Sequence, residues 1–69
     1  GEHGGHNGIT IVDASKFNIS TSDNKAYALD GQSDGKIILR NNAEAYVQYY
    51  KALTIENDGT CTFTGTEVQ

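Results

Sequence analysis

The sequence contains no proline, tryptophan or methionine, and its only cysteine is Cys61. A single cysteine excludes a disulfide within the chain, and without proline no segment is barred from the interior of a β-sheet. No apolar run approaches the ~20 residues of a membrane-spanning helix, which argues against membrane insertion. The chain is therefore compatible with β-strands along its whole length, and it needs a source of stability other than a disulfide.

Basic residues are also few. There are five among 69 residues, scattered along the chain, and the formal net charge is −4. Because nucleic-acid binding depends on clustered lysine and arginine that neutralise phosphates, we expect no nucleic-acid partner.

Large aliphatic residues are scarce as well. Isoleucine, leucine, valine and phenylalanine together number 14, close to the lower limit for a packed core. Small domains compensate with disulfides, metals or oligomerisation. We therefore expect a homo-oligomer, and specifically a trimer whose three chains share one core.

The most regular stretch is LTIENDGTCTFTGTEV, residues 53–68. Apolar and polar residues alternate on both sides of the turn dipeptide Asp58-Gly59, and threonine dominates the second half. Alternation with a period of two predicts strands, and β-branched threonine suits a pleated sheet. Cys61 falls on the apolar face of this pattern, which predicts a small core residue and not a reactive thiol.

Comparable short runs, separated by turn-forming residues every ~8–12 positions, predict an all-β protein. They cover residues 9–12, 17–19, 26–29 and 36–40. Residues 43–51, AEAYVQYYK, are compatible with a short helix or a strand, and the richness in tyrosine and valine favours the strand.

No segment repeats convincingly. The sequence thus predicts a single small domain at residues 9–69, with short strands in a meander, elongated and homo-oligomeric. Its buried residues, at least partly against other chains, are expected to be Ile37, Leu39, Leu53, Ile55 and Phe63.

Residues 1–8, GEHGGHNG, are half glycine and predict a flexible leader. His3 and His6 could chelate a metal such as Zn²⁺ or Ni²⁺ across their glycine spacer, because imidazole is a common metal ligand. The alternative is a leader without any role. We favour that alternative, and expect no cofactor.

The four tyrosines permit two interpretations. Tyr46 and Tyr50 are expected to share one strand face, where exposed rings could stack on a sugar. Alternatively, the rings fill a core between chains. The first interpretation predicts a small carbohydrate-binding module, with a host surface glycan as its partner.

Catalytic residues are not evident. Both histidines lie in the predicted leader, and the carboxylates stand mostly in predicted turns, where they cap backbone amides. Catalysis needs several such groups within hydrogen-bond reach of one another, so we expect no enzymatic activity.

The C-terminal third resembles bacteriophage tail fibres and tail spikes. The pattern consists of a tyrosine pair, a basic–apolar segment, an Asp-Gly or Asn-Gly turn, and a threonine-rich strand; its elements here are Tyr49-Tyr50, Lys51, Leu53, Asp58-Gly59 and Thr62-Phe63-Thr64-Gly65. The resemblance implies an intertwined homotrimer in the virion. The implied function is that of a structural protein, a segment that supports attachment to the host receptor.

Overall fold

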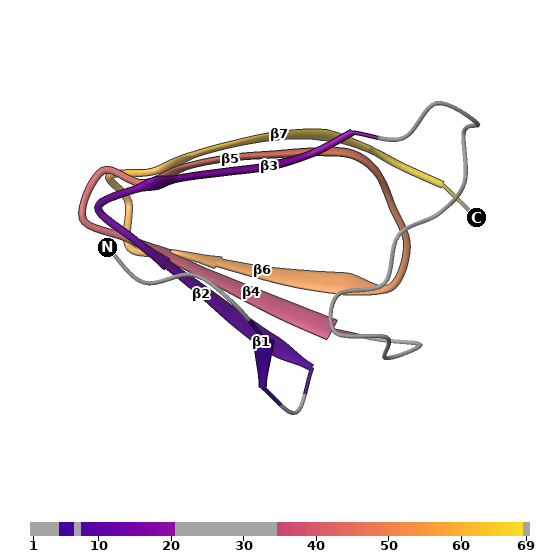
Figure 1. The fold of residues 1–69 in the computed structure, drawn as a ribbon, viewed down its shortest axis with the longest axis horizontal. Coiled ribbons are helices and arrows are strands. Elements are labelled where there is room, and N and C mark those ends of the chain that lie inside the picture. Colours follow the sequence, from indigo (N-terminus) through magenta and orange to yellow (C-terminus); the bar gives the residue numbers. More distant parts are fainter. Residues whose placement is uncertain (1–4, 7, 21–34, 69) are drawn as a thin grey trace.

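The computed structural model describes residues 5–6, 8–20 and 35–68. These residues form strands and no helix, so the all-β prediction is confirmed. Two layers face each other (Figure 1). Sheet A has the strand order β1-β2-β4-β6 and sheet B the order β3-β5-β7. The bounds of the strands are Gly5–His6 for β1, Ile9–Asp13 for β2, Lys16–Ile19 for β3, Gly35–Arg40 for β4, Glu44–Tyr50 for β5, Leu53–Asn57 for β6 and Thr62–Glu67 for β7.

From β2 onward the chain alternates between the two sheets, so that strands next to each other in sequence lie mostly in opposite layers. Within each sheet the neighbours are parallel, β2 with β4 and β4 with β6, and β3 with β5 and β5 with β7. Among the described strands, only the pair β1–β2 is antiparallel. These strands therefore form a short parallel solenoid, and the predicted meander is wrong, because a meander needs antiparallel neighbours.

A structural repeat relates the second and third turns of this solenoid. Lys36 pairs with Thr54 in sheet A, and Glu44 pairs with Thr62 in sheet B, at the same separation along the chain. We call each such turn a rung: β2–β3, β4–β5 and β6–β7. The sequence shows no such repeat, because the repetition lies in backbone position and inward side-chain direction and not in residue identity.

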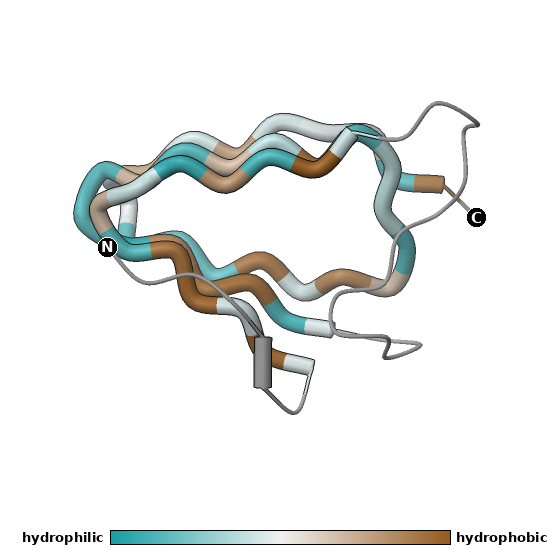
Figure 2. Tube along the Cα trace, in the orientation of Figure 1, coloured by the Kyte–Doolittle hydropathy of each residue, from teal (hydrophilic) through white to brown (hydrophobic). Residues whose placement is uncertain are grey.

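The core lies between the sheets and is centred on the middle rung. Its buried apolar residues are Val12, Ile37, Leu39, Ala43, Ala45 and Val47. Burial of Ile37 and Leu39 is confirmed, whereas Leu53, Ile55 and Phe63 are half-buried and pack against this core from the last rung. Figure 2 shows hydrophobic and hydrophilic residues alternating along the strands.

Residue size is complementary between rungs. Ala45 stands in register between Phe17 and Phe63, so a small side chain lies between two large ones. Such matching of large and small residues helps to fill the interior at the density that folded proteins require. Val47 is in register with Gly65, which is exposed, and an added Cβ at Gly65 would clash with the backbone carbonyl oxygen of Val47.

The segment 43–51 is largely a strand, as predicted, but it is irregular. The register between β5 and β7 shifts between Val47 and Tyr49, which marks a β-bulge at Gln48. A bulge reverses the side-chain alternation beyond it. The ring of Tyr50 consequently meets that of Phe63 edge-on, with centroids 5.4 Å apart at 83°.

Some sequence-based expectations fall outside the described residues. These are the strand at 26–29 and most of the leader, including His3. Gly5 and His6 of that leader form β1 and pair with the start of β2. Among the described residues, no helix is long and apolar enough to cross a membrane.

Candidate functional site

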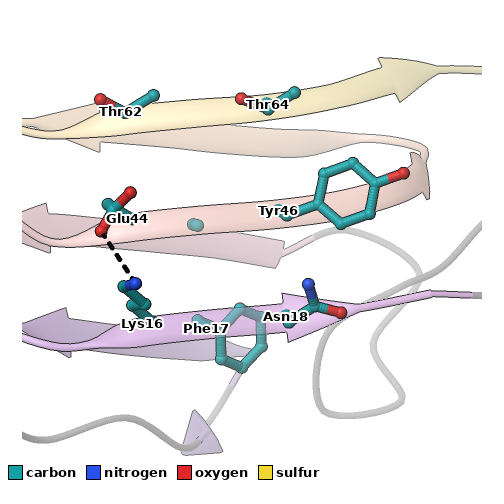
Figure 3. Close-up of a pocket in the computed structure, with 8 residues that line it drawn as sticks. Lys16, Phe17, Asn18, Glu44, Tyr46, Thr62 and Thr64 are labelled. Carbon is teal, nitrogen blue, oxygen red and sulfur yellow. Dashed lines mark ion pairs between the residues drawn. The ribbon is translucent and has the colours of Figure 1, made fainter.

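A shallow groove lies on the outer face of sheet B. Its volume is about 310 Å³. The floor and walls come from all three strands of the sheet, so the groove runs across the rungs (Figure 3). The lining residues are Lys16, Phe17, Asn18, Glu44, Ala45, Tyr46, Thr62 and Thr64.

Strand alternation and parallel register together determine which side chains meet in the groove. Asn18 is in register with Tyr46, and Tyr46 with Thr64, so these three form one row across the sheet. Inward residues such as Phe17 project from the opposite face, as Figure 3 shows. The outward row thus offers one aromatic ring flanked by an amide and a hydroxyl.

The neighbouring row consists of Lys16, Glu44 and Thr62. The Nζ atom of Lys16 lies 3.7 Å from Oε2 of Glu44, and both side chains are largely exposed. An exposed ion pair of this kind contributes little to stability, so its groups can exchange their partner for a ligand. The groove combines a cation, an anion, hydroxyls and an amide beside one ring.

Tyr46 and Tyr50, which the sequence assigns to one strand face, are separated by the structure. Tyr46 is 37% exposed and lines the groove. Tyr50 contacts Phe63 and is not part of the groove lining. The expectation of a shared face is wrong because the bulge at Gln48 reverses the alternation between the two residues.

The predicted metal ligands are not brought together with others in the described part of the chain. His6 belongs to β1 and His3 lies outside the described residues. Among the residues that are described, no group of three or more histidine, cysteine, aspartate or glutamate side chains is arranged to hold a metal ion.

A second polar cluster occupies the corner where β2, β4 and β6 end. The carboxylate of Asp13 accepts hydrogen bonds from the Asn41 amide at 2.7 Å and from Nε of Arg40 at 2.9 Å. These contacts, the Asn41 bond foremost, lower the pKa of Asp13 below its usual value. The corner thus links the first two rungs through side chains.

Asp58 links the second and third rungs at the same corner. Its Oδ2 atom accepts the backbone N–H of Asn41 at 2.9 Å, and its Oδ1 atom accepts both the hydroxyl and the backbone N–H of Thr60. The Thr60 hydroxyl, followed by the backbone donors, lowers the pKa of Asp58 from 3.8 to about 2. The Cys61 thiol, 3.7 Å from Oδ1, also donates to this carboxylate.

The corner network is satisfied by the chain itself. Asn41 and Asn42 adopt positive φ angles of 59° and 62°, a conformation that asparagine tolerates better than most residues. The Thr60 hydroxyl oxygen accepts the backbone N–H of Asn42 at 2.8 Å. The carboxylates of Asp13 and Asp58 already accept hydrogen bonds from several donors within the chain, so this corner stabilises the fold. The groove is therefore the better candidate for a binding site.

Sequence reasoning identified Tyr46 but missed Lys16, Asn18, Glu44, Thr62 and Thr64. Their outward direction follows from strand alternation. Their proximity follows only from the parallel pairing of strands that are far apart in sequence. Comparison of the chain with models of protein families, with curated proteins and with solved structures found no match in any of the three.

Proposed function

We propose that this chain is a non-enzymatic structural segment of a phage tail fibre or tail spike, and that it supports attachment of the virion to its host. One observation carries the proposal. Successive rungs are stacked in parallel in both sheets, so that each rung adds length in one direction. Elongation by stacking is what a protein needs to hold a receptor-binding tip away from a particle.

The arrangement of stabilising contacts agrees with a mechanical role. Each rung is joined to the next by backbone ladders in both sheets, by the inward core, and by the corner bonds of Asp13 and Asp58. Cross-rung ion pairs add to these on the surface, including Lys36 with Glu56 at 2.9 Å. Contacts between neighbouring rungs only are the mark of a quasi-one-dimensional structure.

The side chains that line the groove also agree better with a structural role than with a catalytic one. Of its lining residues, Glu44 alone carries a carboxylate. Hydrolysis of a glycosidic bond requires a pair of carboxylates about the scissile bond. The proposed assembly is an intertwined homotrimer in which the three chains share part of their core.

Two measurements test the proposal. An antibody raised against the chain should label the tail appendages of tailed particles from its natural source in electron micrographs. The mass in solution should correspond to three chains or a multiple of three. Labelling confined to cells that contain no particles, together with a monomeric mass, would refute the proposal.

A second candidate function is carbohydrate binding in the groove, and the exposure of Tyr46 favours it. The ring lies between Asn18 and Thr64, which can donate to and accept from sugar hydroxyls while the ring stacks on a sugar face. In a fibre, such a groove would contact a host glycan directly.

A glycan array tests this candidate. We expect saturable binding to a defined sugar that is lost in Tyr46→Ala. Tyr49→Ala is the matched control, because Tyr49 lies on the same strand and outside the groove lining. Equal binding by both variants would exclude the groove as the site.

A further inference from the structure

The connection between β6 and β7 begins with an Asp-Gly dipeptide, Asp58-Gly59. In such a dipeptide the backbone nitrogen of the glycine can attack the side-chain carboxyl carbon of the aspartate, because glycine has no Cβ to hinder the approach. A new C–N bond closes a five-membered succinimide ring, and the carboxyl hydroxyl group leaves with the N–H proton as water. Water then opens the ring at either carbonyl carbon, which restores aspartate or yields isoaspartate with no net change in mass.

The attacking nitrogen is engaged in the folded chain. The backbone N–H of Gly59 donates to Oδ1 of Asn57 at 2.8 Å, and the same oxygen accepts the backbone N–H of Cys61 at 3.2 Å. Ring closure requires Gly59 to lose this proton, and an amide oxygen accepts hydrogen bonds but is not a base that removes a proton. The reaction therefore breaks the bond between Gly59 and Asn57.

The carboxyl group is engaged as well, through both of its oxygens. Oδ2 of Asp58 accepts the backbone N–H of Asn41 at 2.9 Å, from the corner of the middle rung. Oδ1 accepts the backbone N–H and the hydroxyl of Thr60 at 2.8 and 2.6 Å. Because ring closure expels one of the two oxygens as water, at least one of these donors loses its acceptor. We call these bonds, together with that of Gly59 to Asn57, the joint.

Ionisation protects the same carboxyl group. The hydroxyl of Thr60, followed by the backbone donors, lowers the pKa of Asp58 from 3.8 to about 2. A nucleophile attacks the neutral acid far more readily than the carboxylate, which already carries a negative charge. At neutral pH the neutral fraction of Asp58 is smaller by roughly 60-fold than that of an aspartate with the ordinary pKa. The bonds that hold the carboxyl group in place therefore also make it unreactive.

We propose that Asp58-Gly59 is a site of aspartate isomerisation whose reaction is confined to chains in which the joint has opened. In the closed joint, ring closure has to break one hydrogen bond at the nitrogen and at least one at the carboxyl group. Opening of the joint releases both groups together, because residues 57–61 form one connected set of hydrogen bonds. The rate of modification then follows the population of the open state.

Isomerisation makes the opening permanent. In isoaspartate the main chain runs through the side-chain carbon, so the backbone gains one methylene group and the free carboxylate is attached directly to Cα. This carboxylate lies one bond closer to the backbone, which withdraws it from the N–H of Asn41. The connection from β6 to β7 is lengthened at the same time. Each modified chain thus retains a last rung that is less firmly joined to the middle one.

The first measurement compares the folded chain with the same chain unfolded in guanidinium chloride, at the same neutral pH and temperature. Digestion and chromatography separate the aspartate and isoaspartate forms of the peptide that contains position 58. They also separate this dipeptide from the two other Asp-Gly dipeptides of the sequence, at 30–31 and 34–35. We expect isomerisation at position 58 to be roughly tenfold slower or more in the folded chain, because the reaction there requires opening of the joint.

Two variants weaken the joint from opposite sides. Thr60→Val removes the hydroxyl that donates to Asp58 and keeps the β-branched shape, whereas Asn57→Ala removes the acceptor of the Gly59 N–H. Each should speed isomerisation in the folded chain severalfold, with little change in the unfolded chain. Thr66→Val is the matched control, because Thr66 is an exposed threonine of β7 outside the joint.

A general loss of stability has to be distinguished from opening of the joint. Val12→Ala truncates a fully buried side chain of β2, which β4 separates from β6, so this substitution weakens the fold away from Asp58. Small amounts of guanidinium chloride bring Val12→Ala and Thr60→Val to the same free energy of unfolding. At matched stability we expect Thr60→Val to isomerise faster, because only this substitution acts on the joint itself.

Several results would overturn the inference. Equal rates in the folded and unfolded chains would show that the joint gives no protection. Equal rates in Thr60→Val, Asn57→Ala and Thr66→Val would show that its bonds are not the cause. A rate in Val12→Ala as high as in Thr60→Val at matched stability would assign the protection to the fold as a whole. A chain synthesised with isoaspartate at position 58 should melt at a lower temperature, and an unchanged melting temperature would contradict permanent opening.

Discussion

The middle rung and the last rung have the same backbone path and differ in what covers them. Ile37 and Ile55 are the same residue type in the same register, yet Ile37 is fully buried and Ile55 is half-buried. The middle rung has neighbours on both sides, whereas the last has β4 and β5 on one side only in the described structure. In a stacked structure, position in the stack decides burial as much as hydrophobicity does.

The largest effect on stability is expected from truncating one leucine in each of the two rungs. Leu39→Ala should destabilise the fold by about 2–5 kcal/mol, because removing a fully buried side chain leaves a cavity between rungs. Leu53→Ala should cost clearly less, because its side chain already borders solvent. Chemical denaturation of both variants measures the difference, and equal losses would show that the last rung is covered in solution.

A second test concerns the close approach of β5 and β7. Gly65→Ala should cost about 1–3 kcal/mol, because the new Cβ meets the backbone carbonyl of Val47, which cannot rotate away. Thr64→Ala is the control, since its side chain points outward into the groove. If Gly65→Ala is as stable as the control, β7 must lie farther from β5 in solution than it does in this structure.

Acid should loosen the joint between the middle and last rungs. Asp58 has a pKa of about 2 in the folded chain against an ordinary 3.8, so its contribution is present above pH 3.8 and is lost as the pH falls toward 2. The melting temperature should drop across this window. In Asp58→Asn the drop should be smaller, and an identical acid profile would exclude Asp58 as its origin.

The smallest expected effect comes from the surface pair that joins the same two rungs. Lys36 and Glu56 are 2.9 Å apart with side chains 40% and 52% exposed. A double-mutant cycle with alanine should give a coupling of about 0.2–1 kcal/mol that declines with salt. A coupling that is independent of salt would point to packing of the side-chain stems instead.

Local pattern predicted the strands well and their partners poorly. The compact apolar run at residues 36–40 and the alternation around Ile55 were sufficient to identify β4 and β6, because both patterns are properties of each strand alone. Parallel pairing depends instead on residues from different rungs, and these rarely match: Lys36 stands beside Thr54, and Leu39 beside Asn57. The repeat is thus nearly invisible in residue identity.

The candidate site was predictable to a similar extent. Alternation placed Tyr46 on one strand face but left open whether that face was exposed or in a core. The turn of Tyr50 toward Phe63 depends on a bulge at Gln48 that no glycine marks. The expected sharing of the core between chains stays a prediction. The described part of a single chain already buries six apolar residues by itself.

The equal spacing of the last two rungs has a genetic consequence. A duplication of the codons for one rung would insert a new turn whose residues meet the same kinds of neighbours as before, so such a chain can lengthen by tandem duplication without any redesign of its interior. The paired Ile9 and Lys36 lie farther apart in sequence than the paired Lys36 and Thr54, so additional sequence is accommodated between rungs without loss of register. Length and surface can thus evolve independently, the first by copying rungs and the second by enlarging the connections between them.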